Sequence, residues 1–285
     1  NPALATKSVL FGGIFNIFGD YFFVFTLDMG ILGAGLATAM GISMSVFMML
    51  THFRSPINTM HFVKVPRLPE MFGKIAANGF SSFIIDIAMG VLTMLFNRQI
   101  MRYLGSDALA VYAVIVNIST FVQCCAYGVG QAAQPIISQN YGAGHSDRVS
   151  RLLRYSLISC AVIGAAWTAA VIALPNGFIK LFMSPTAAVL AIAPEIMRIY
   201  AVSFLLLPYN VFSTYYFQAM LRPGTSIIIS VSRGIVISGA LIMLLPLLLG
   251  SNSVWFAMPI AEAATAVYVT ASIAQVQKAF QNPEC

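Results

Sequence analysis

The sequence predicts an all-α protein that crosses a membrane about eight times. Charged residues make up 8% of the 285 residues and hydrophobic residues 59%, and the mean hydropathy is +0.85. In a soluble domain roughly a quarter of the residues are charged. This composition is therefore typical of a polytopic membrane protein.

The apolar runs are long enough to be spanning helices, each of which needs about 20 apolar residues. No run alternates at period 2, as the strand of a membrane barrel would, so helices are expected throughout. The expected spans are 3–27, 30–53, 75–104, 107–137, 151–175, 188–220, 225–249 and 253–277.

The net charge of +6 follows the expected topology. The side on which the first span begins holds Lys7, Arg54, Lys64, Arg67, Lys74, Arg148, Arg151, Arg154, Arg222, Arg233 and Lys278. The opposite side holds Arg98, Arg102, Lys180 and Arg198. The excess predicts that the first side is cytoplasmic, with loops 54–74 and 138–151 on it. The expected partner of these charges is the lipid bilayer, not a nucleic acid.

One long polar connector, "RSPINTMHFVKVPRLPEMFGK", divides the chain. Its prolines and basic residues are typical of a boundary between helix bundles. The expected division is two helices in 1–53, a linker in 54–74 and a six-helix bundle in 75–285. Similar glycine turns at Gly30 and Gly250 favour an internal repeat, in which four partner helices would lie upstream.

Polar residues within the apolar runs are the candidates for function. They fall on one face of the third, fourth and sixth spans, which suggests a shared aqueous cavity. The simpler alternative is that they join helices through hydrogen bonds. The candidates are Asn78, Ser82 and Asp86 on the third span, Asn117, Tyr127, Gln131 and Gln134 on the fourth, and Asn210, Ser213, Thr214 and Gln218 on the sixth.

An acidic residue inside an apolar run costs about 3 kcal/mol on insertion scales, so it needs a partner. Asp86 is expected to be protonated, paired across helices, or part of an ion or proton site. Asp20 and Glu262 are expected to be cross-helix pairs, interfacial acids or functional groups. Pro135 and Pro208 each remove a helix hydrogen bond and are candidate hinges.

Enzyme chemistry has little support in the sequence. No metalloprotease, nucleophile-elbow or phosphate-loop motif is present, and no Cys/His spacing predicts a metal site. An intramembrane aspartyl hydrolase would need Asp20 and Asp86 to share a proton, and no second catalytic motif surrounds Asp86. We therefore predict no enzyme activity, no metal and no organic cofactor.

Several motifs together resemble the MATE family of multidrug efflux transporters. The motifs are "NIFGDYFFVFTLDMGILGAGLAT", "GQAAQPIISQNYGAG", "RIYAVSF", "SVSRG" and "VWFAMPIAE". They cover the chain in the order of the family's fifth to twelfth helices. The resemblance implies a twelve-helix, two-bundle fold in the bacterial inner membrane, of which this chain would hold the last eight helices.

The resemblance also implies antiport, in which a gradient of H⁺ or Na⁺ drives export of small amphiphilic, often cationic compounds by a monomer. Asp86 lies on the family's seventh helix, about one turn from the position at which some members carry a Glu. The position of a tenth-helix acid falls near Val211, with Asn210 beside it. This departure leaves the coupling ion open and favours the MepA/DinF-like branch. A flippase for lipid-linked saccharides and a purely structural membrane subunit are the alternatives.

Overall fold

Every regular element in the described part of the chain is a helix, which confirms the all-α class. The computed structural model describes residues 2–58 and 68–281. The contacts between Cα atoms divide the chain into two compact units, Asn1–Arg67 and Leu68–Cys285. Each unit is described by itself.

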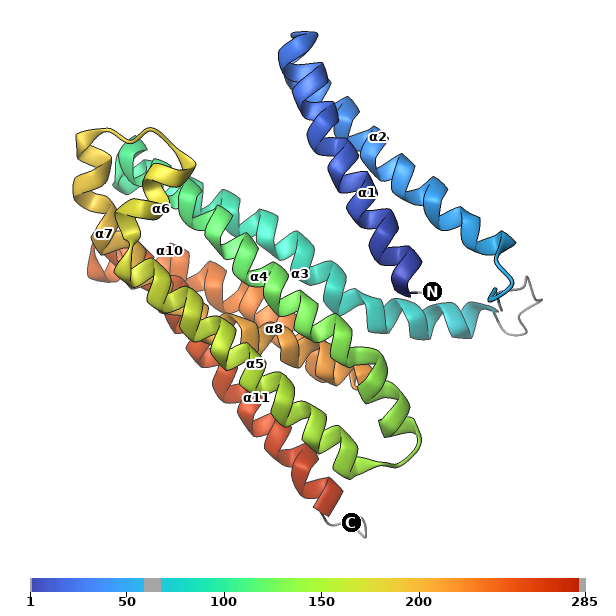
Figure 1. Ribbon diagram of the computed structural model, residues 1–285. Coiled ribbons are helices and arrows are strands. Elements are labelled where there is room, and N and C mark those ends of the chain that lie inside the picture. The colour runs from blue at the N-terminus through green and yellow to red at the C-terminus, as the bar shows by residue number, and fades with distance from the viewer. Residues whose placement is uncertain (1, 59–67, 282–285) are drawn as a thin grey trace. The chain divides into compact units, whose positions relative to one another are not determined.

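The first unit is a helical hairpin (Figure 1). Its turn contains Asp28 and Gly30, whose φ angles of 51° and 54° place both residues in the left-handed region. The elements are α1 (Pro2–Asp20), the π-helical segment η1 (Tyr21–Thr26), α2 (Gly30–Leu50) and the 3-10 segment η2 (Thr51–Arg54).

Small residues allow α1 and α2 to pack with their backbones close together. The buried residues of α2 are Gly33, Ala37 and Gly41, one in every four positions. A Cβ atom on Gly41 would lie 2.7 Å from the carbonyl oxygen of Gly12, so neither position has room for a larger side chain. Small residues at this spacing are a common basis of helix association in membranes.

The second unit is a helix bundle (Figure 1). Its long helices are α3 (Leu68–Tyr103), α4 (Gly105–Gly142), α5 (Ser146–Ala173) and α11 (Ala257–Gln281). The shorter elements are α6 (Pro175–Phe182), α7 (Ala187–Ala201), α8 (Ser203–Ala219), α9 (Pro223–Val231), the π-helical segment η3 (Ser232–Val236), α10 (Ile237–Leu249) and the 3-10 segment η4 (Ser251–Phe256).

Helix α8 is the central element of this bundle. It contacts α4, α5, α9 and α11, and most of its residues are buried. A helix that is buried on nearly all sides needs no polar outer face. The polar residues of α8 must therefore find hydrogen-bond partners inside the bundle.

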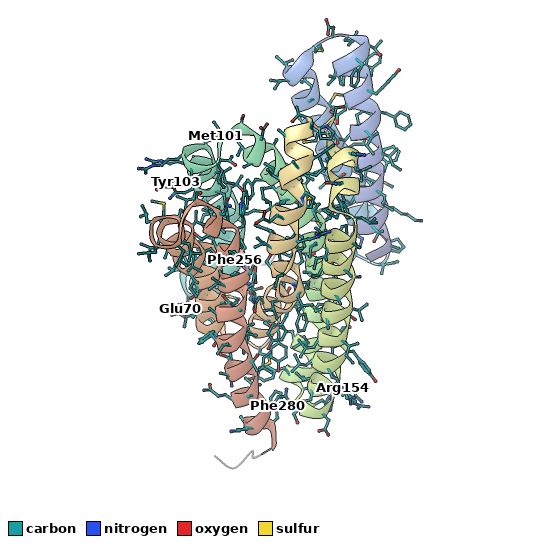
Figure 2. All side chains as sticks on the ribbon, turned by 90° about the vertical axis from the view of Figure 1, so that its left-hand side faces the viewer. Glu70, Met101, Tyr103, Arg154, Phe256 and Phe280 are labelled. Carbon is teal, nitrogen blue, oxygen red and sulfur yellow. The ribbon has the colours of Figure 1, made fainter. Side chains whose placement is uncertain are left out.

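The outside of the bundle is apolar, as expected for a membrane protein. Met101 and Phe256 are 52% and 47% exposed (Figure 2). Seven helical segments of the described residues are long and apolar enough to cross a membrane: Ala3–Thr26, Gly30–Arg54, Gly105–Gly142, Ser146–Ala173, Ala187–Ala219, Pro223–Leu249 and Ser251–Phe280. The remaining expected span, 75–104, lies in α3, which includes side chains outside the described set.

Several element boundaries differ from those expected. Helix α3 begins at Leu68 rather than near residue 75, and the expected loop 138–151 is reduced to the few residues between Gly142 and Ser146. The expected span 188–220 is one helical segment, Ala187–Ala219, in which the turn residue Val202 separates α7 from α8. Helix therefore extends further into the polar ends of the spans than the apolar runs alone indicate.

Candidate functional site

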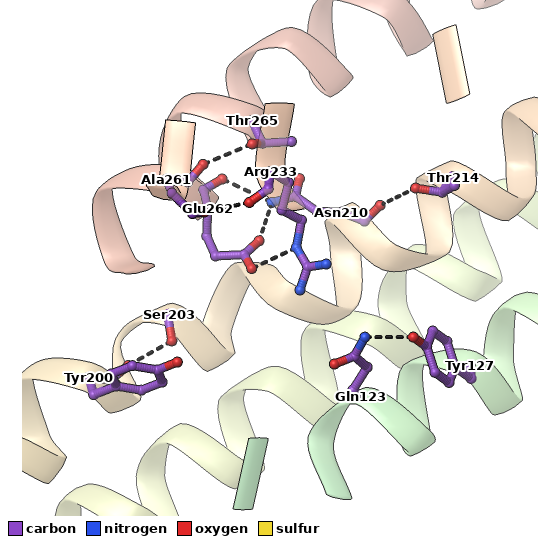
Figure 3. Close-up of polar contacts among 11 residues, drawn as sticks. Gln123, Tyr127, Tyr200, Ser203, Asn210, Thr214, Arg233, Ala261, Glu262 and Thr265 are labelled. Atoms are coloured by element: carbon purple, nitrogen blue, oxygen red, sulfur yellow. Dashed lines mark hydrogen bonds and ion pairs between the residues drawn. The ribbon is translucent and has the colours of Figure 1, made fainter. Parts of the chain in front are cut away.

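A buried ion pair joins η3 to α11 (Figure 3). The Nε atom of Arg233 lies 2.7 Å from Oε1 of Glu262, and this contact is both a hydrogen bond and a salt bridge. The Glu262 side chain is fully buried and that of Arg233 is 11% exposed. Such burial would be costly for either charge alone, so each residue depends on the other.

Asn210 of α8 completes the site, which we call the Asn210–Arg233–Glu262 triad. Its Nδ2 atom donates to Oε2 of Glu262 at 2.6 Å and to the Glu262 main-chain oxygen at 2.9 Å (Figure 3). Both carboxylate oxygens of Glu262 thus accept a hydrogen bond from another helix. The Oδ1 atom of Asn210 is buried and has no hydrogen-bond partner among the described residues.

The triad lies deep within the expected membrane region. Arg233 is ten residues after the start of its span at Pro223, and Glu262 is eleven residues after the start of its span at Ser251. At about 1.5 Å per residue, each position is roughly 15 Å from the first residue of its span, near the middle of the hydrocarbon core. Arg233 sits in the π-helical segment η3, and such segments inside α-helices are frequent at functional sites.

A small cavity borders Arg233. Its volume is about 60 Å³, which holds a few water molecules and is far below the roughly 300 Å³ of a drug-sized pocket. Its polar side chains could together hold water beside the ion pair. They are Thr93, Tyr112, Ser119, Gln123, Tyr200, Ser230 and Arg233. The remaining lining is mostly apolar, from α3, α8 and α11 among others.

The polar residues expected on α8 are buried in the bundle. Ser213 donates to the Tyr209 carbonyl at 2.7 Å, and Thr214 donates to the Asn210 carbonyl at 3.3 Å. Gln218 accepts a hydrogen bond from Gln134 of α4 at 3.5 Å. None of these α8 residues lines the cavity beside Arg233.

The polar residues expected on α4 have different surroundings. Asn117 and Gln131 are exposed on the second unit, whereas Gln134 is partly buried. Tyr127 accepts a hydrogen bond of 2.6 Å from Gln123, which is one of the cavity residues. The sequence-predicted face of α4 therefore has an exposed part and a part that reaches the interior.

The candidates on α3 are only partly described. Asn78, Ser82 and Asp86 lie on the helical backbone of α3, but their side chains lie outside the described set. Their role stays a prediction. In the first unit, Oδ1 of Asp20 is buried without a hydrogen-bond partner among the described residues, and the nearby Asn16 donates to Thr38 at 3.3 Å.

The two candidate hinge prolines lie inside continuous helices. Helix α4 runs through Pro135 and α8 runs through Pro208. The break between the helices α7 and α8 lies at Val202, six residues before Pro208. Pro208 has no amide to donate to the Phe204 carbonyl, so the helix on this side of the break is already short of one hydrogen bond.

Helix α5 supports the break at Val202. Thr168 donates to the Ala201 carbonyl at 3.2 Å. One turn earlier, Gly164 brings the α5 backbone close to α8, since a Cβ atom there would lie 2.7 Å from the Leu205 oxygen and 2.9 Å from the Phe204 oxygen. Carbonyl groups of Ala201, Phe204 and Leu205 thus lie against α5.

Sequence reasoning missed Arg233 as a site residue. It was placed among the cytoplasmic surface charges, but it lies within a span and contacts Glu262. The available signal was its position in "SVSRG", which has apolar residues on both sides. Glu262 forms a pair with Arg233 on another helix, which is one of the arrangements expected for it from the sequence.

Comparison with known proteins agrees with this architecture. Residues 78–245 match the MatE family. The chain is 25% identical over 256 residues to the multidrug export protein MepA of Staphylococcus saprophyticus, covering 89% of this chain and 56% of that protein. It is 23% identical over 268 residues to MepA of Staphylococcus aureus, covering 93% and 58%. The chain thus spans little more than half the length of these relatives.

Solved structures show the same fold. A multidrug resistance MATE family transporter in an outward-facing conformation matches with a TM-score of 0.86 at 19% identity, over 96% of this chain and 62% of that one. A transporter of the MOP superfamily from Pyrococcus furiosus matches with a TM-score of 0.86 at 18% identity, over 97% and 63%.

The helical spans and the ion pair buried within them define a polytopic membrane protein. The family match extends over more than half of the chain. The chain belongs to the MatE family.

Proposed function

We propose that the chain is part of a cation-coupled exporter of amphiphilic, cationic compounds. The observation that carries this proposal is the buried Asn210–Arg233–Glu262 triad within the spans of a MatE chain. Ionisable residues inside the membrane are rare and are typical of ion and substrate pathways. The named relatives are multidrug export proteins, which supports the same substrate class.

In this proposal Glu262 is a charged centre that can exchange its hydrogen bonds to Asn210 and Arg233 for contacts with an ion. Glu262 accepts from two helices at once, so a change in its charge would alter contacts to both η3 and α8. The cavity beside Arg233 would supply water to this centre. H⁺ or Na⁺ is the coupling ion, and the triad favours neither of them on geometry alone.

The exposed polar face of α4 is the proposed lining of the substrate path. Asn117 and Gln131 are exposed within an apolar span. Asn117 donates to the Ala113 carbonyl at 2.9 Å, but contact with lipid would leave its amide oxygen and the amide of Gln131 without partners. Facing a water-filled path would satisfy them. Asp86, Asn78 and Ser82 on α3 are proposed members of the same path.

The proposed organisation follows the sequence division. Residues 1–53 would end one bundle, 54–74 would be a cytoplasmic linker, and 75–285 would form the second bundle, in a monomeric protein of the bacterial cell membrane. A flippase for lipid-linked saccharides would need a strongly cationic cavity. The basic residue that lines the cavity in the described part of the chain is Arg233, and its charge is offset by Glu262.

Efflux of ethidium from cells that express the full-length protein tests this function. We expect efflux by the wild type and its loss in Glu262→Gln and Asp86→Asn at equal membrane expression. The control is Glu195→Gln, which changes an exposed acid. In proteoliposomes, imposed H⁺ and Na⁺ gradients would identify the coupling ion. Wild-type protein that moves no cationic dye under either gradient would overturn the proposal.

A further inference from the structure

We propose that the groove between α4 and α5 binds an anionic phospholipid, with an acyl chain in the groove and the headgroup at Arg148 and Arg151. The inference requires only that the two helices lie in a membrane. It does not depend on the proposed transport activity.

The groove is open and mostly apolar. Its volume is about 520 Å³, and its walls include Cys125, Ala132 and Ile136 from α4 and Leu152 and Tyr155 from α5. Small residues on α4 leave the space, and the ring of Tyr155 is 65% exposed beside it. An open, mostly apolar groove between two spanning helices matches the chemistry of an acyl chain.

One end of the groove is basic. Arg148 and Arg151 lie four residues before Leu152 and Tyr155, so they share the groove face of α5. Both are exposed, and neither has a salt-bridge partner in the part of the chain that the structure describes. Arg154 projects from the same end of α5 (Figure 2), and Asp147 is the acidic residue there.

The net charge of this end is positive even with Asp147 included. Basic clusters beside apolar grooves at the membrane surface attract anionic headgroups. Tyr155 lies one turn after Arg151, and tyrosine is enriched near the membrane–water interface in membrane proteins. Charge and depth therefore both match a phospholipid that carries a net negative charge.

The orientation of α4 separates this groove from the polar face. At 100° per residue, Cys125, Val129 and Ile136 lie about a third of a turn from Asn117 and Gln131. Helix α4 thus has two exposed faces with different chemistry. The apolar face carries the groove.

A fluorescence experiment tests the occupant directly. Tyr155→Trp places a reporter at the groove in the full-length protein, and the parent protein with its native tryptophans, Trp167 and Trp255 among them, sets the background. The protein is reconstituted with phosphatidylglycerol or phosphatidylcholine that carries brominated acyl chains. We expect stronger quenching of the added Trp by brominated phosphatidylglycerol. Equal quenching by the two lipids, or no quenching of this Trp because another segment of the protein covers the groove, would overturn the proposal.

Two variants separate the headgroup from the groove. In Arg148→Gln/Arg151→Gln the preference for phosphatidylglycerol should fall about 5-fold for each arginine, from the attraction of one basic residue to an anionic surface. Arg148→Lys/Arg151→Lys should retain it. Ala132→Leu should reduce quenching by both lipids because it fills the groove.

The matched control is Arg98→Gln/Arg102→Gln, which removes two exposed arginines from another end of the bundle. It should leave the lipid preference unchanged. A preference that survives Arg148→Gln/Arg151→Gln, or that is lost equally in the control, would show that the headgroup is not bound at Arg148 and Arg151.

Discussion

Arg233 and Glu262 are 29 residues apart in the sequence, and their Nε and Oε1 atoms lie 2.7 Å apart. The two residues belong to consecutive spans, Pro223–Leu249 and Ser251–Phe280. Their charges offset each other where neither could be solvated by bulk water. The stability of this part of the bundle should therefore depend on the pair.

Removal of one partner should be more damaging than removal of both. Glu262→Gln or Arg233→Gln should each lower the free energy of unfolding by about 3–5 kcal/mol, because the remaining polar group loses its buried partner. Arg233→Met/Glu262→Met should recover most of this loss. Unfolding in mild detergent, followed by circular dichroism, measures the difference.

The double variant should nevertheless lose ethidium efflux, which separates a functional role of the triad from a structural one. A double variant as unstable as either single variant would contradict the pairing. Full efflux by the stable double variant would show that the pair only holds the helices together.

Asn210→Leu should lower the free energy of unfolding by about 1–3 kcal/mol, because the Glu262 carboxylate loses a buried donor. Ser213→Ala is the matched control on the same helix, since the Ser213 hydroxyl bonds only to a carbonyl of its own helix. Its effect should be much smaller. Thermal unfolding of both variants side by side is the measurement, and equal losses would argue against a special role of Asn210.

Gly164→Ala should destabilise the protein by about 1–3 kcal/mol, because the added methyl group meets two backbone oxygens of α8 rather than a flexible side chain. The comparison is Gly177→Ala in α6, where the nearest atom to the added carbon is 3.7 Å away. That change should be neutral or slightly stabilising, since alanine favours helix over glycine. Melting temperatures in detergent would distinguish the two, and a neutral Gly164→Ala would mean that α5 can move away from the break at Val202.

Gln131→Leu should leave folding unchanged, because the side chain is exposed, and should reduce ethidium efflux by about 2- to 12-fold, the effect of one lost hydrogen bond. Phe121→Leu, another exposed change on α4, should leave efflux unchanged. Initial efflux rates at matched expression provide the test. Undiminished efflux in Gln131→Leu would remove this position from the proposed path.

The sequence predicts the class of fold well because the membrane imposes a local requirement. Each span must satisfy its own backbone hydrogen bonds and present apolar side chains, and both properties can be recognised in a window of about 20 residues. The glycine turns at Gly30 and Gly250 are local in the same sense, since their positive φ angles favour a residue without a Cβ atom.

The interruption at Val202 is not local. It lies six residues from Pro208, and the carbonyl groups of Ala201 and Phe204 beside it lie against Thr168 and Gly164 on another helix. A proline in an apolar run indicates that a helix can bend, but the position of the break depends on which helix receives its carbonyls. Pattern analysis of one span has no access to that contact.

The triad illustrates the same limit for the site. Counting basic residues by expected topology placed Arg233 at the membrane surface, because such counting ignores how far a residue lies inside its run. The partner of Glu262 can be identified only from the three-dimensional structure, which places η3 next to α11. Asn210 was recognised from the sequence, but as a cavity residue, whereas it is fully buried and bonds to Glu262.

The location of the ion pair on two consecutive spans has a consequence for synthesis of the protein. A segment with an arginine at its centre enters the bilayer at a cost of about 2.5–3.5 kcal/mol, and an isolated glutamate in the next segment is also unfavourable. The turn at Gly250 joins the two segments directly, so they can leave the translocon as one hairpin in which the charges of Arg233 and Glu262 offset each other. The newly made chain would then keep Arg233 near the translocon until Glu262 has emerged from the ribosome.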